Sequence, residues 1–223
     1  MTKKMATIFR TDGFRSVLCL PRKETVTMRM KSAITRGLVL SLVMLGSLAL
    51  ASSVFAQGAA HALSRFPNLL RNPGFESGPD GTWISSPDVI GSWGNPHSGY
   101  CYAWLNGYGQ KHTDWLSQTV TIPSAVTSAT LSFWLGIKTD ETTTVAEPDR
   151  LKVQIRNDYG VTLATLATYS NLDATPDYRY HSFDVTPFRG QKVQVYFLGY
   201  EDSSRPTSFF IDDTALRVTP SFP

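Results

Sequence analysis

The apolar residues of this chain come in short segments that are separated by turn-forming residues. In L-K-V-Q-I-R, the side chains of Leu151, Val153 and Ile155 fall on one face of an extended backbone, and their polar neighbours fall on the other. A period of two is typical of a β-strand with one buried face. K-V-Q-V-Y-F at 192–197 repeats this pattern, and no segment beyond residue 67 has a helical period. We therefore expect an all-β fold, an antiparallel β-sandwich of the jelly-roll type.

Ten segments beyond residue 67 are rich in β-branched or aromatic residues and are bounded by turn residues. If the last six alternate in direction, the loops 139–150, 169–177 and 201–207 meet at one end of the sandwich. That end would collect an acidic cluster that includes Glu141, Asp149 and Asp202. Solvated loop carboxylates, a second calcium site and a hidden catalytic pair are the alternatives for it. The expected strands are residues 68–71, 82–85, 100–105, 115–122, 129–138, 151–156, 162–168, 178–185, 192–200 and 208–218.

The first part of the chain has the pattern of an export signal. From Met30 a basic segment, an apolar stretch and the small-residue sequence A-S-S-V-F-A follow one another, which predicts cleavage after Ala56. Met30 is the expected start, and an unusually long basic region is the alternative. The mature protein would be secreted or periplasmic, without a membrane span. The expected organisation is an export signal region at 1–56, a linker at 57–67, a β-sandwich domain at 68–218 and a tail at 219–223.

Removal of this leader changes the sign of the net charge. The whole chain has 21 Lys and Arg residues against 18 Asp and Glu residues, whereas residues 57–223 have 12 against 16. A mildly acidic domain gives no electrostatic support to the binding of a polyanion. Nucleic acid is therefore not an expected partner.

Two motifs at the ends of the expected domain resemble those of a known fold family. The opening motif N-x-G-F-E contains Gly74 and Glu76, and the closing motif F-x-I-D-D-x-x-L contains Asp212 and Asp213. Both are similar to the ends of galactose-binding-like jelly rolls, which include many carbohydrate-binding modules. The middle of the chain, with L-S-F-W-L-G-I-K-T-D-E-T-T and D-R-L-K-V-Q-I-R-N, resembles the accessory β-domains of bacterial secreted peptidases of the sedolisin and subtilisin types.

The resemblance implies a structural calcium ion that joins the two ends of the domain. In that fold the Glu of the opening motif and an Asp of the closing motif are among its ligands, which here match Glu76 and Asp212. Asp213 is the alternative ligand. Adjacent residues of a strand point to opposite faces, so only one of the two aspartates is expected to face Glu76. Calcium prefers six to eight oxygen ligands, and carboxylates with turn carbonyls could supply them. The alternative is that these carboxylates are solvated or form ion pairs with Arg71 or Arg217.

No catalytic signature is present in residues 57–223. The histidines of this part, His61, His97, His112 and His181, occur in no nucleophile elbow and no H-E-x-x-H motif. We therefore expect a protein that is not an enzyme.

Aromatic residues are concentrated in the first half of the expected domain. Sugar rings stack their apolar faces on flat aromatic side chains, and amide side chains can bind their hydroxyl groups. This composition favours a glycan-binding module, although core packing is the alternative for each aromatic residue. A protein-interaction or adhesion domain is the second functional hypothesis, and a glycan-active enzyme is the third. The candidate ligand-binding residues are Trp93, Tyr100, Tyr102, Trp104, Asn106 and Tyr108.

Overall fold

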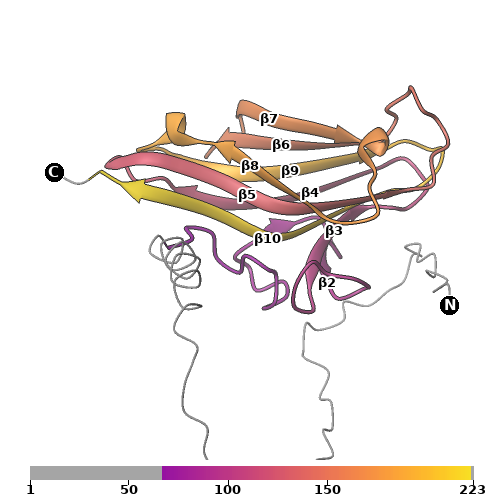
Figure 1. Cartoon of the computed structure of the whole chain (residues 1–223), viewed down its shortest axis with the longest axis horizontal. Coiled ribbons are helices and arrows are strands. Elements are labelled where there is room, and N and C mark those ends of the chain that lie inside the picture. The colour runs from indigo at the N-terminus through magenta and orange to yellow at the C-terminus, as the bar shows by residue number, and fades with distance from the viewer. Residues whose placement is uncertain (1–66, 222–223) are drawn as a thin grey trace, which may run out of the picture. The chain divides into compact units, whose positions relative to one another are not determined.

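The computed structural model describes residues 67–221. The predicted export signal region, almost all of the predicted linker and the last two residues lie outside this part of the chain. Within it the fold is a sandwich of two antiparallel five-stranded sheets (Figure 1). The expected all-β sandwich is therefore confirmed. No helix among residues 67–221 is long and apolar enough to cross a membrane.

Each sheet is built from strands that are distant in the sequence. Sheet A has the order β2-β3-β10-β5-β8, and sheet B has the order β1-β4-β9-β6-β7. Sheet A consists of β2 (Ile90–Gly91), β3 (Tyr102–Asn106), β10 (Thr207–Pro220), β5 (Val126–Thr139) and β8 (Arg179–Asp184). Sheet B consists of β1 (Ile84–Ser85), β4 (His112–Thr121), β9 (Lys192–Glu201), β6 (Arg150–Asn157) and β7 (Thr162–Ser170). Two short 3₁₀ turns, η1 (Asn171–Asp173) and η2 (Thr186–Phe188), flank β8.

The core lies between the sheets and follows the period of two in the sequence. Leu151, Val153 and Ile155 of β6 are fully buried, and they face apolar residues of sheet A such as Phe133 and Phe209. Burial of such side chains is the main source of stability in a sandwich of this kind. The alternate residues of the same strands point outward, so the outer faces of the sheets carry the residues that are free to serve a function.

The prediction of a first strand at residues 68–71 is wrong. Residues 69–71 form bends, and a single isolated bridge joins Asn68 to Arg217. The Asn68 side chain replaces strand pairing: its Nδ2 donates to the carbonyl of Thr214 at 2.9 Å, and its Oδ1 accepts from the N–H of Leu216 at 2.8 Å. The short strand β2 was not expected, because only two residues pair there.

The loops at 139–150, 169–177 and 201–207 meet at one end of the sandwich, as expected. The Oδ1 atom of Asp149 accepts from the N–H of Asp202 at 2.9 Å, and the N–H of Asn171 donates to the carbonyl of Asp149 at 3.3 Å. Consecutive strands from β5 to β10 alternate in direction, although most of them lie in different sheets. This alternation returns every second loop to the same end.

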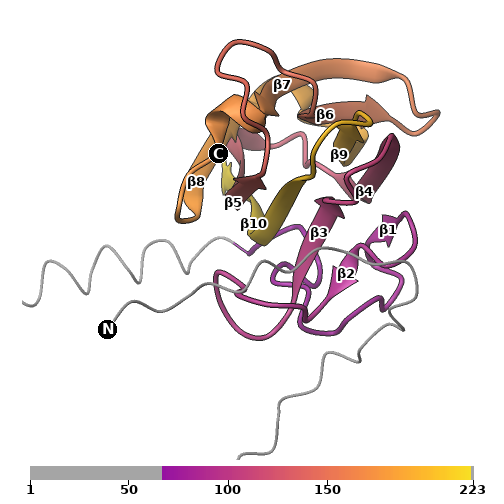
Figure 2. The same ribbon diagram turned by 90° about the vertical axis from the view of Figure 1, so that its right-hand side faces the viewer.

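The outer faces of the two sheets differ in how they are covered. The segment before β3 lies along the outer face of sheet A, where His97 stacks on Trp134 with ring centroids 3.9 Å apart. In Figures 1 and 2 no described segment crosses the outer face of β9 and β6 in sheet B. This uncovered face is the one on which a large ligand has access to side chains from several strands.

Candidate functional site

A row of outward-facing side chains crosses sheet B. Ser117 of β4 pairs with Tyr196 of β9, Tyr196 pairs with Gln154 of β6, and Gln154 pairs with Thr165 of β7. Residues paired across antiparallel strands present their side chains on the same face. We call the group formed by Trp115, Gln154, Arg156, Thr165 and Tyr196 the sheet B platform.

Two aromatic rings and one cation form the centre of the sheet B platform. The rings of Trp115 and Tyr196 are nearly parallel, with an interplanar angle of 8° and centroids 5.9 Å apart. The guanidinium carbon of Arg156 lies 3.4 Å from the centroid of the Tyr196 ring, which is the geometry of a cation–π contact. All three side chains are half-buried, so each keeps part of its surface in contact with solvent.

A chain of hydrogen bonds fixes the polar part of the sheet B platform. Arg156 donates from Nε and Nη2 to Oε1 of Gln154, at 3.0 and 2.7 Å. Gln154 in turn donates from Nε2 to Oγ1 of Thr165 at 3.2 Å. These bonds hold the side chains in one arrangement, which lowers the entropy that a ligand would otherwise have to remove on binding.

These residues were not among the site residues predicted from the sequence. Gln154 and Arg156 were interpreted only as the polar side of an amphipathic strand, and Trp115 was one member of a general aromatic enrichment. The signal that could have identified them is the outward position of Tyr196 in K-V-Q-V-Y-F, where a large aromatic residue occupies a polar position of the alternation.

The ligand-binding residues predicted from the sequence do not form one surface. Tyr102, Trp104 and Asn106 are buried in β3, and the ring of Trp93 packs edge-on against Tyr102 and Trp104, with centroids 6.3 and 6.0 Å away. The period-two argument placed Tyr102 and Trp104 on one face correctly. That face of sheet A is covered by the segment that contains Trp93, so these residues are packed and do not form a ligand platform.

The remaining two predicted residues lie elsewhere. Tyr100 is 51% exposed beside the loop that precedes β3. Tyr108 is half-buried, and its ring lies 4.0 Å, centroid to centroid, from the ring of His112. The six predicted residues therefore divide into a packed cluster of Trp93, Tyr102 and Trp104 and three separate positions, Asn106, Tyr100 and Tyr108.

Asn106 is tightly enclosed by the neighbouring sheet. Its side chain is fully buried, and a β-carbon added to Gly199 of β9 would overlap Oδ1 of Asn106. Gly199→Ala is therefore expected to lower the free energy of unfolding by about 1–3 kcal/mol, as overpacking usually does. Urea unfolding followed by tryptophan fluorescence measures this. Gly136→Ala is the matched control, because its new β-carbon would meet Phe210 and Tyr178 side chains at an ordinary 3.4 Å. Equal stability of the two variants would contradict this packing.

Glu76, Asp212 and Asp213 come together at the loop 97–101; we call them the carboxylate cluster. Oδ2 of Asp212 accepts from the N–H groups of His97 and Ser98 at 2.9 and 3.1 Å. Oε1 of Glu76 accepts from the N–H groups of residues 100 and 101 at 2.9 and 3.0 Å. The opening and closing motifs therefore hold the same loop from two sides.

The expectation that only one of the two aspartates faces Glu76 is wrong. A register shift interrupts β10 after Asp212, and Asp213 has a positive φ of 46°. This bulge breaks the alternation of side chains. A β-carbon on Gly74 would lie 3.3 Å from Oδ1 of Asp213, 3.8 Å from Oδ1 of Asp212 and 3.9 Å from Cγ of Glu76. All three acidic side chains therefore approach the same turn.

The burial of Asp212 and the number of side-chain ligands decide how the carboxylate cluster could hold a hard cation. Asp212 is fully buried, and burial, opposed by hydrogen bonds and reinforced by the charge of Asp213, raises its pKa to about 7. Asp213 of the cluster forms an ion pair with His97, whose Nδ1 lies 2.6 Å from Oδ2 of Asp213. No group of three or more His, Cys, Asp or Glu side chains in this part of the chain has the arrangement of a metal site. Backbone oxygens would therefore have to complete the coordination.

The acidic loop cluster is assembled at the end of the sandwich, where its carboxylates bind backbone groups. Oε1 of Glu141 accepts from the N–H of Arg205 at 2.9 Å, and Oδ1 of Asp202 accepts from the N–H of Ser204 at 2.7 Å. Burial, together with the charges of Asp202 and Glu141, raises the pKa of Asp149 against the effect of its hydrogen bonds. Through these contacts the acidic loop cluster holds the loops 139–150 and 201–207 together.

Glu201 is the central carboxylate of this end, although it was not among the site residues predicted from the sequence. It is fully buried, and its two oxygens accept from four backbone N–H groups. The donors are Gly107, Tyr108, Gly109 and Thr207, at 3.1, 3.0, 2.9 and 3.3 Å. A carboxylate has about four lone-pair sites, so Glu201 has none left for a metal ion or a substrate.

Comparison with known proteins gives matches among solved structures. No family model matches the chain, and no curated protein matches it by sequence. TmCBM61 in complex with β-1,4-galactotriose is 19% identical and has a TM-score of 0.49; the match covers 67% of this chain and 97% of that one. The CBM22-1 xylan-binding domain of Paenibacillus barcinonensis Xyn10C is 14% identical, with a TM-score of 0.43 and coverage of 67% and 93%. The Stig cyclase Fisc of Fischerella sp. TAU is 16% identical, with a TM-score of 0.47 and coverage of 70% and 100%. These similarities concern the fold, and the function has to be argued from the residues of this chain.

Proposed function

We propose that this chain is a non-catalytic glycan-binding module that holds its ligand on the sheet B platform. The observation that carries the proposal is the parallel Trp115–Tyr196 pair beside the fixed side chains of Arg156 and Gln154. Glycan sites combine a flat apolar surface with a few hydrogen-bonding groups, because a sugar ring has apolar C–H faces and a rim of hydroxyl groups.

Each part of the sheet B platform has a distinct role in this proposal. The exposed part of the Trp115 ring contacts the C–H face of a sugar unit, and the Tyr196 ring, one face of which is covered by the Arg156 guanidinium, borders this contact. Arg156 has donors beyond the two that bind Gln154, and these are directed to sugar hydroxyl or ring oxygens. Among residues 67–221 no segment covers this face, which suits a polysaccharide chain that extends across several strands.

The carboxylates of the described domain support a binding role over a catalytic one. Hydrolysis of a glycosidic bond requires two carboxyl groups that are free to act as acid and as base or nucleophile. Glu201, Asp149, Glu141 and Asp202 accept hydrogen bonds from backbone N–H groups. We therefore assign no reaction to the acidic end.

We include export and a structural calcium ion in the proposal. The leader pattern before residue 57 supports a secreted or periplasmic protein. The buried Asp212 with its raised pKa, beside Glu76 and Asp213, supports calcium at the carboxylate cluster. Calcium bound there would offset the charge of Asp212 and tie the two end motifs together.

A protein-binding role is the second candidate, and one observation favours it. The hairpin between β6 and β7 exposes three large apolar side chains in a row: Tyr159 is 92% exposed, Val161 58% and Leu163 42%. Exposed apolar patches are typical of interaction surfaces. None of these three residues belongs to the sheet B platform, so variants can separate the two roles.

Trp115→Ala is expected to weaken polysaccharide binding at least tenfold, which corresponds to about 1.4 kcal/mol. The loss follows from removal of one of the two stacked rings. Isothermal titration calorimetry with soluble β-galactan, xylan and β-glucan measures it. Tyr159→Ala is the matched control, since it removes an exposed aromatic ring elsewhere and should leave the affinity unchanged. Equal affinities of Trp115→Ala and the unaltered chain would exclude the sheet B platform as the binding site. If none of the three polysaccharides binds, a protein partner is favoured.

A further inference from the structure

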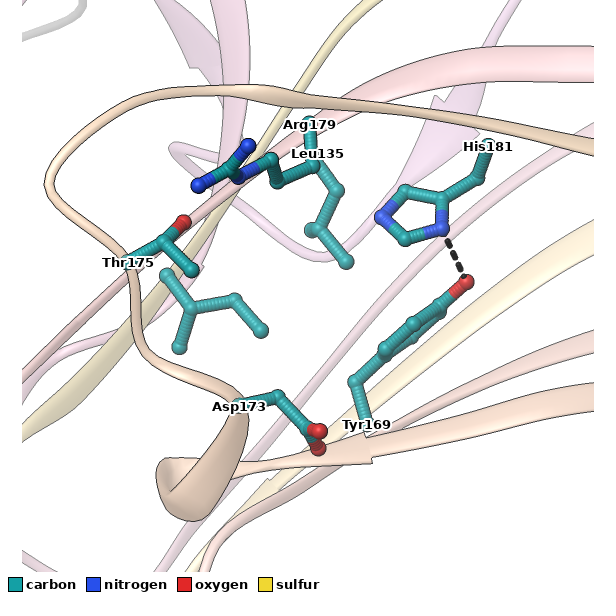
Figure 3. Close-up of a pocket in the computed structure, with 7 residues that line it drawn as sticks. Leu135, Tyr169, Asp173, Thr175, Arg179 and His181 are labelled. Carbon is teal, nitrogen blue, oxygen red and sulfur yellow. Dashed lines mark hydrogen bonds between the residues drawn. The ribbon is translucent and has the colours of Figure 1, made fainter.

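A second binding feature lies at the open side of the sandwich, away from the sheet B platform. The outermost strands β7 and β8 belong to different sheets and do not pair with each other. Between them is a pocket of about 140 Å³, shown in Figure 3. Its lining includes Leu135, Ile137, Tyr169, Thr175, Arg179 and His181.

The floor of this edge pocket is apolar. Leu135 and Ile137 are core residues of β5 that are only 2% and 4% exposed, and they line the pocket. An apolar cavity of about 150 Å³ is large enough to hold a benzene ring. The edge pocket therefore has the size and the lining for one six-membered ring.

One polar group is directed into the edge pocket. The hydroxyl of Tyr169 and Nδ1 of His181 form a hydrogen bond of 2.7 Å. Burial raises the pKa of Tyr169 to about 12 and lowers the pKa of His181. At neutral pH both side chains are therefore uncharged, and the donor in this bond depends on the imidazole tautomer. We assign the tautomer that has its hydrogen on Nε2, in which the tyrosine hydroxyl donates to Nδ1. In Figure 3 this second ring nitrogen of His181 faces the space between Leu135 and Tyr169.

The mouth of the edge pocket carries two opposite charges. Asp173 of η1 and Arg179 of β8 both line it, and both residues are exposed. Asp173 also caps η1, since its Oδ2 accepts from the N–H of Ser170 at 2.8 Å. The two charges balance, so the mouth has no net charge that would select an ion.

We propose that the edge pocket binds a small uncharged ring that is mainly apolar and carries one hydrogen-bond acceptor. The ring contacts Leu135 and Ile137, and the acceptor receives the hydrogen bond from Nε2 of His181. Tyr169 positions this donor by holding Nδ1. The site is independent of the sheet B platform, and either can be present without the other.

The test uses cyclohexanone, which has an acceptor, and toluene, which has the same number of non-hydrogen atoms and no strong acceptor. Methyl NMR spectra of the chain are titrated with each compound, and the signals of Leu135 and Ile137 are followed. We expect both compounds to shift these signals. His181→Phe should weaken cyclohexanone about tenfold, the value for one lost hydrogen bond, and leave toluene unchanged.

Two further variants keep the result interpretable. Tyr169→Phe frees the imidazole to adopt either tautomer and should weaken cyclohexanone severalfold, which tests the donor even if His181→Phe does not fold. Trp115→Ala should leave both compounds unaffected, because it alters only the sheet B platform. The proposal is overturned if neither compound shifts the two methyl signals. It is also overturned if His181→Phe changes the affinity for cyclohexanone and the affinity for toluene by the same factor.

Discussion

Glu201→Gln is expected to lower the free energy of unfolding by about 3 kcal/mol or more. Glu201 is fully buried and accepts hydrogen bonds from four N–H groups in two loops. Glutamine keeps one oxygen acceptor and replaces the other by an amide group that donates. At least two backbone N–H groups then lose their acceptor, and each buried group without a partner costs about 1–3 kcal/mol. Chemical unfolding in urea measures the change.

Glu147→Gln is the matched control for this prediction. Glu147 lies in a neighbouring loop, is exposed and forms an ion pair with Arg150 at 3.5 Å. Exposed pairs contribute little, so the control should change stability by about 0.5 kcal/mol or less. Burial raises the pKa of Glu201, while its backbone hydrogen bonds act in the opposite direction. A nearly neutral Glu201→Gln variant would mean that the carboxyl group is protonated in the native state and would contradict the role assigned to the anion.

Without divalent cations the domain is expected to lose stability as the pH is raised from about 5 to about 8. The pKa of Asp212 is about 7 in the folded chain, against an ordinary value of 3.8. Between these values the native state holds a proton that the unfolded state has released, so stability falls as pH rises through this window. The loss is complete above pH 7 and amounts to at most about 4 kcal/mol. Calcium bound at the carboxylate cluster would offset the same charge.

Thermal unfolding at pH 5 and pH 8, with calcium or with EDTA, measures both effects. Calcium should raise the midpoint at pH 8 and have little effect at pH 5, because a ligand that favours the native state stabilises it. Asp212→Asn should reduce both the pH dependence and the calcium response, whereas Asp88→Asn, at an exposed position, should retain both. A midpoint that rises with pH in EDTA would contradict the pKa of Asp212, and no response to calcium at pH 8 would contradict the proposed ion.

The parts of the fold that were predictable are those set by local alternation. Val153 and Ile155 had to face the core because a strand with period two can bury only one side, and this also fixed the outward position of Gln154. The direction of the strands followed from their order, which is why the meeting of Asp149 with Asp202 could be expected. Such inferences need no knowledge of distant contacts.

The candidate site was less predictable because it depends on which face is covered. Trp104 and Trp115 occupy similar sequence contexts, yet the segment around Trp93 covers the first and leaves the second half-exposed. The bulge at Asp213 was equally hidden, since a residue with positive φ outside glycine has no strong sequence signal. Four N–H groups around Glu201 come from two loops, and their convergence exists only in the folded chain.

The position of β10 between β3 and β5 has a consequence for the order in which the chain can fold. Asn68 forms hydrogen bonds with residues that are 146 and 148 positions later in the chain. A chain under synthesis therefore lacks the central strand of sheet A until residues 207–220 have been made. Contacts of such long sequence separation slow folding, because the entropy of closing the chain has to be lost first. The segment around Asn68 is thus made before β10 and acquires these contacts only after it. The pairs β5–β8 and β2–β3 do not need β10, but sheet A is expected to be completed only when β10 inserts between them.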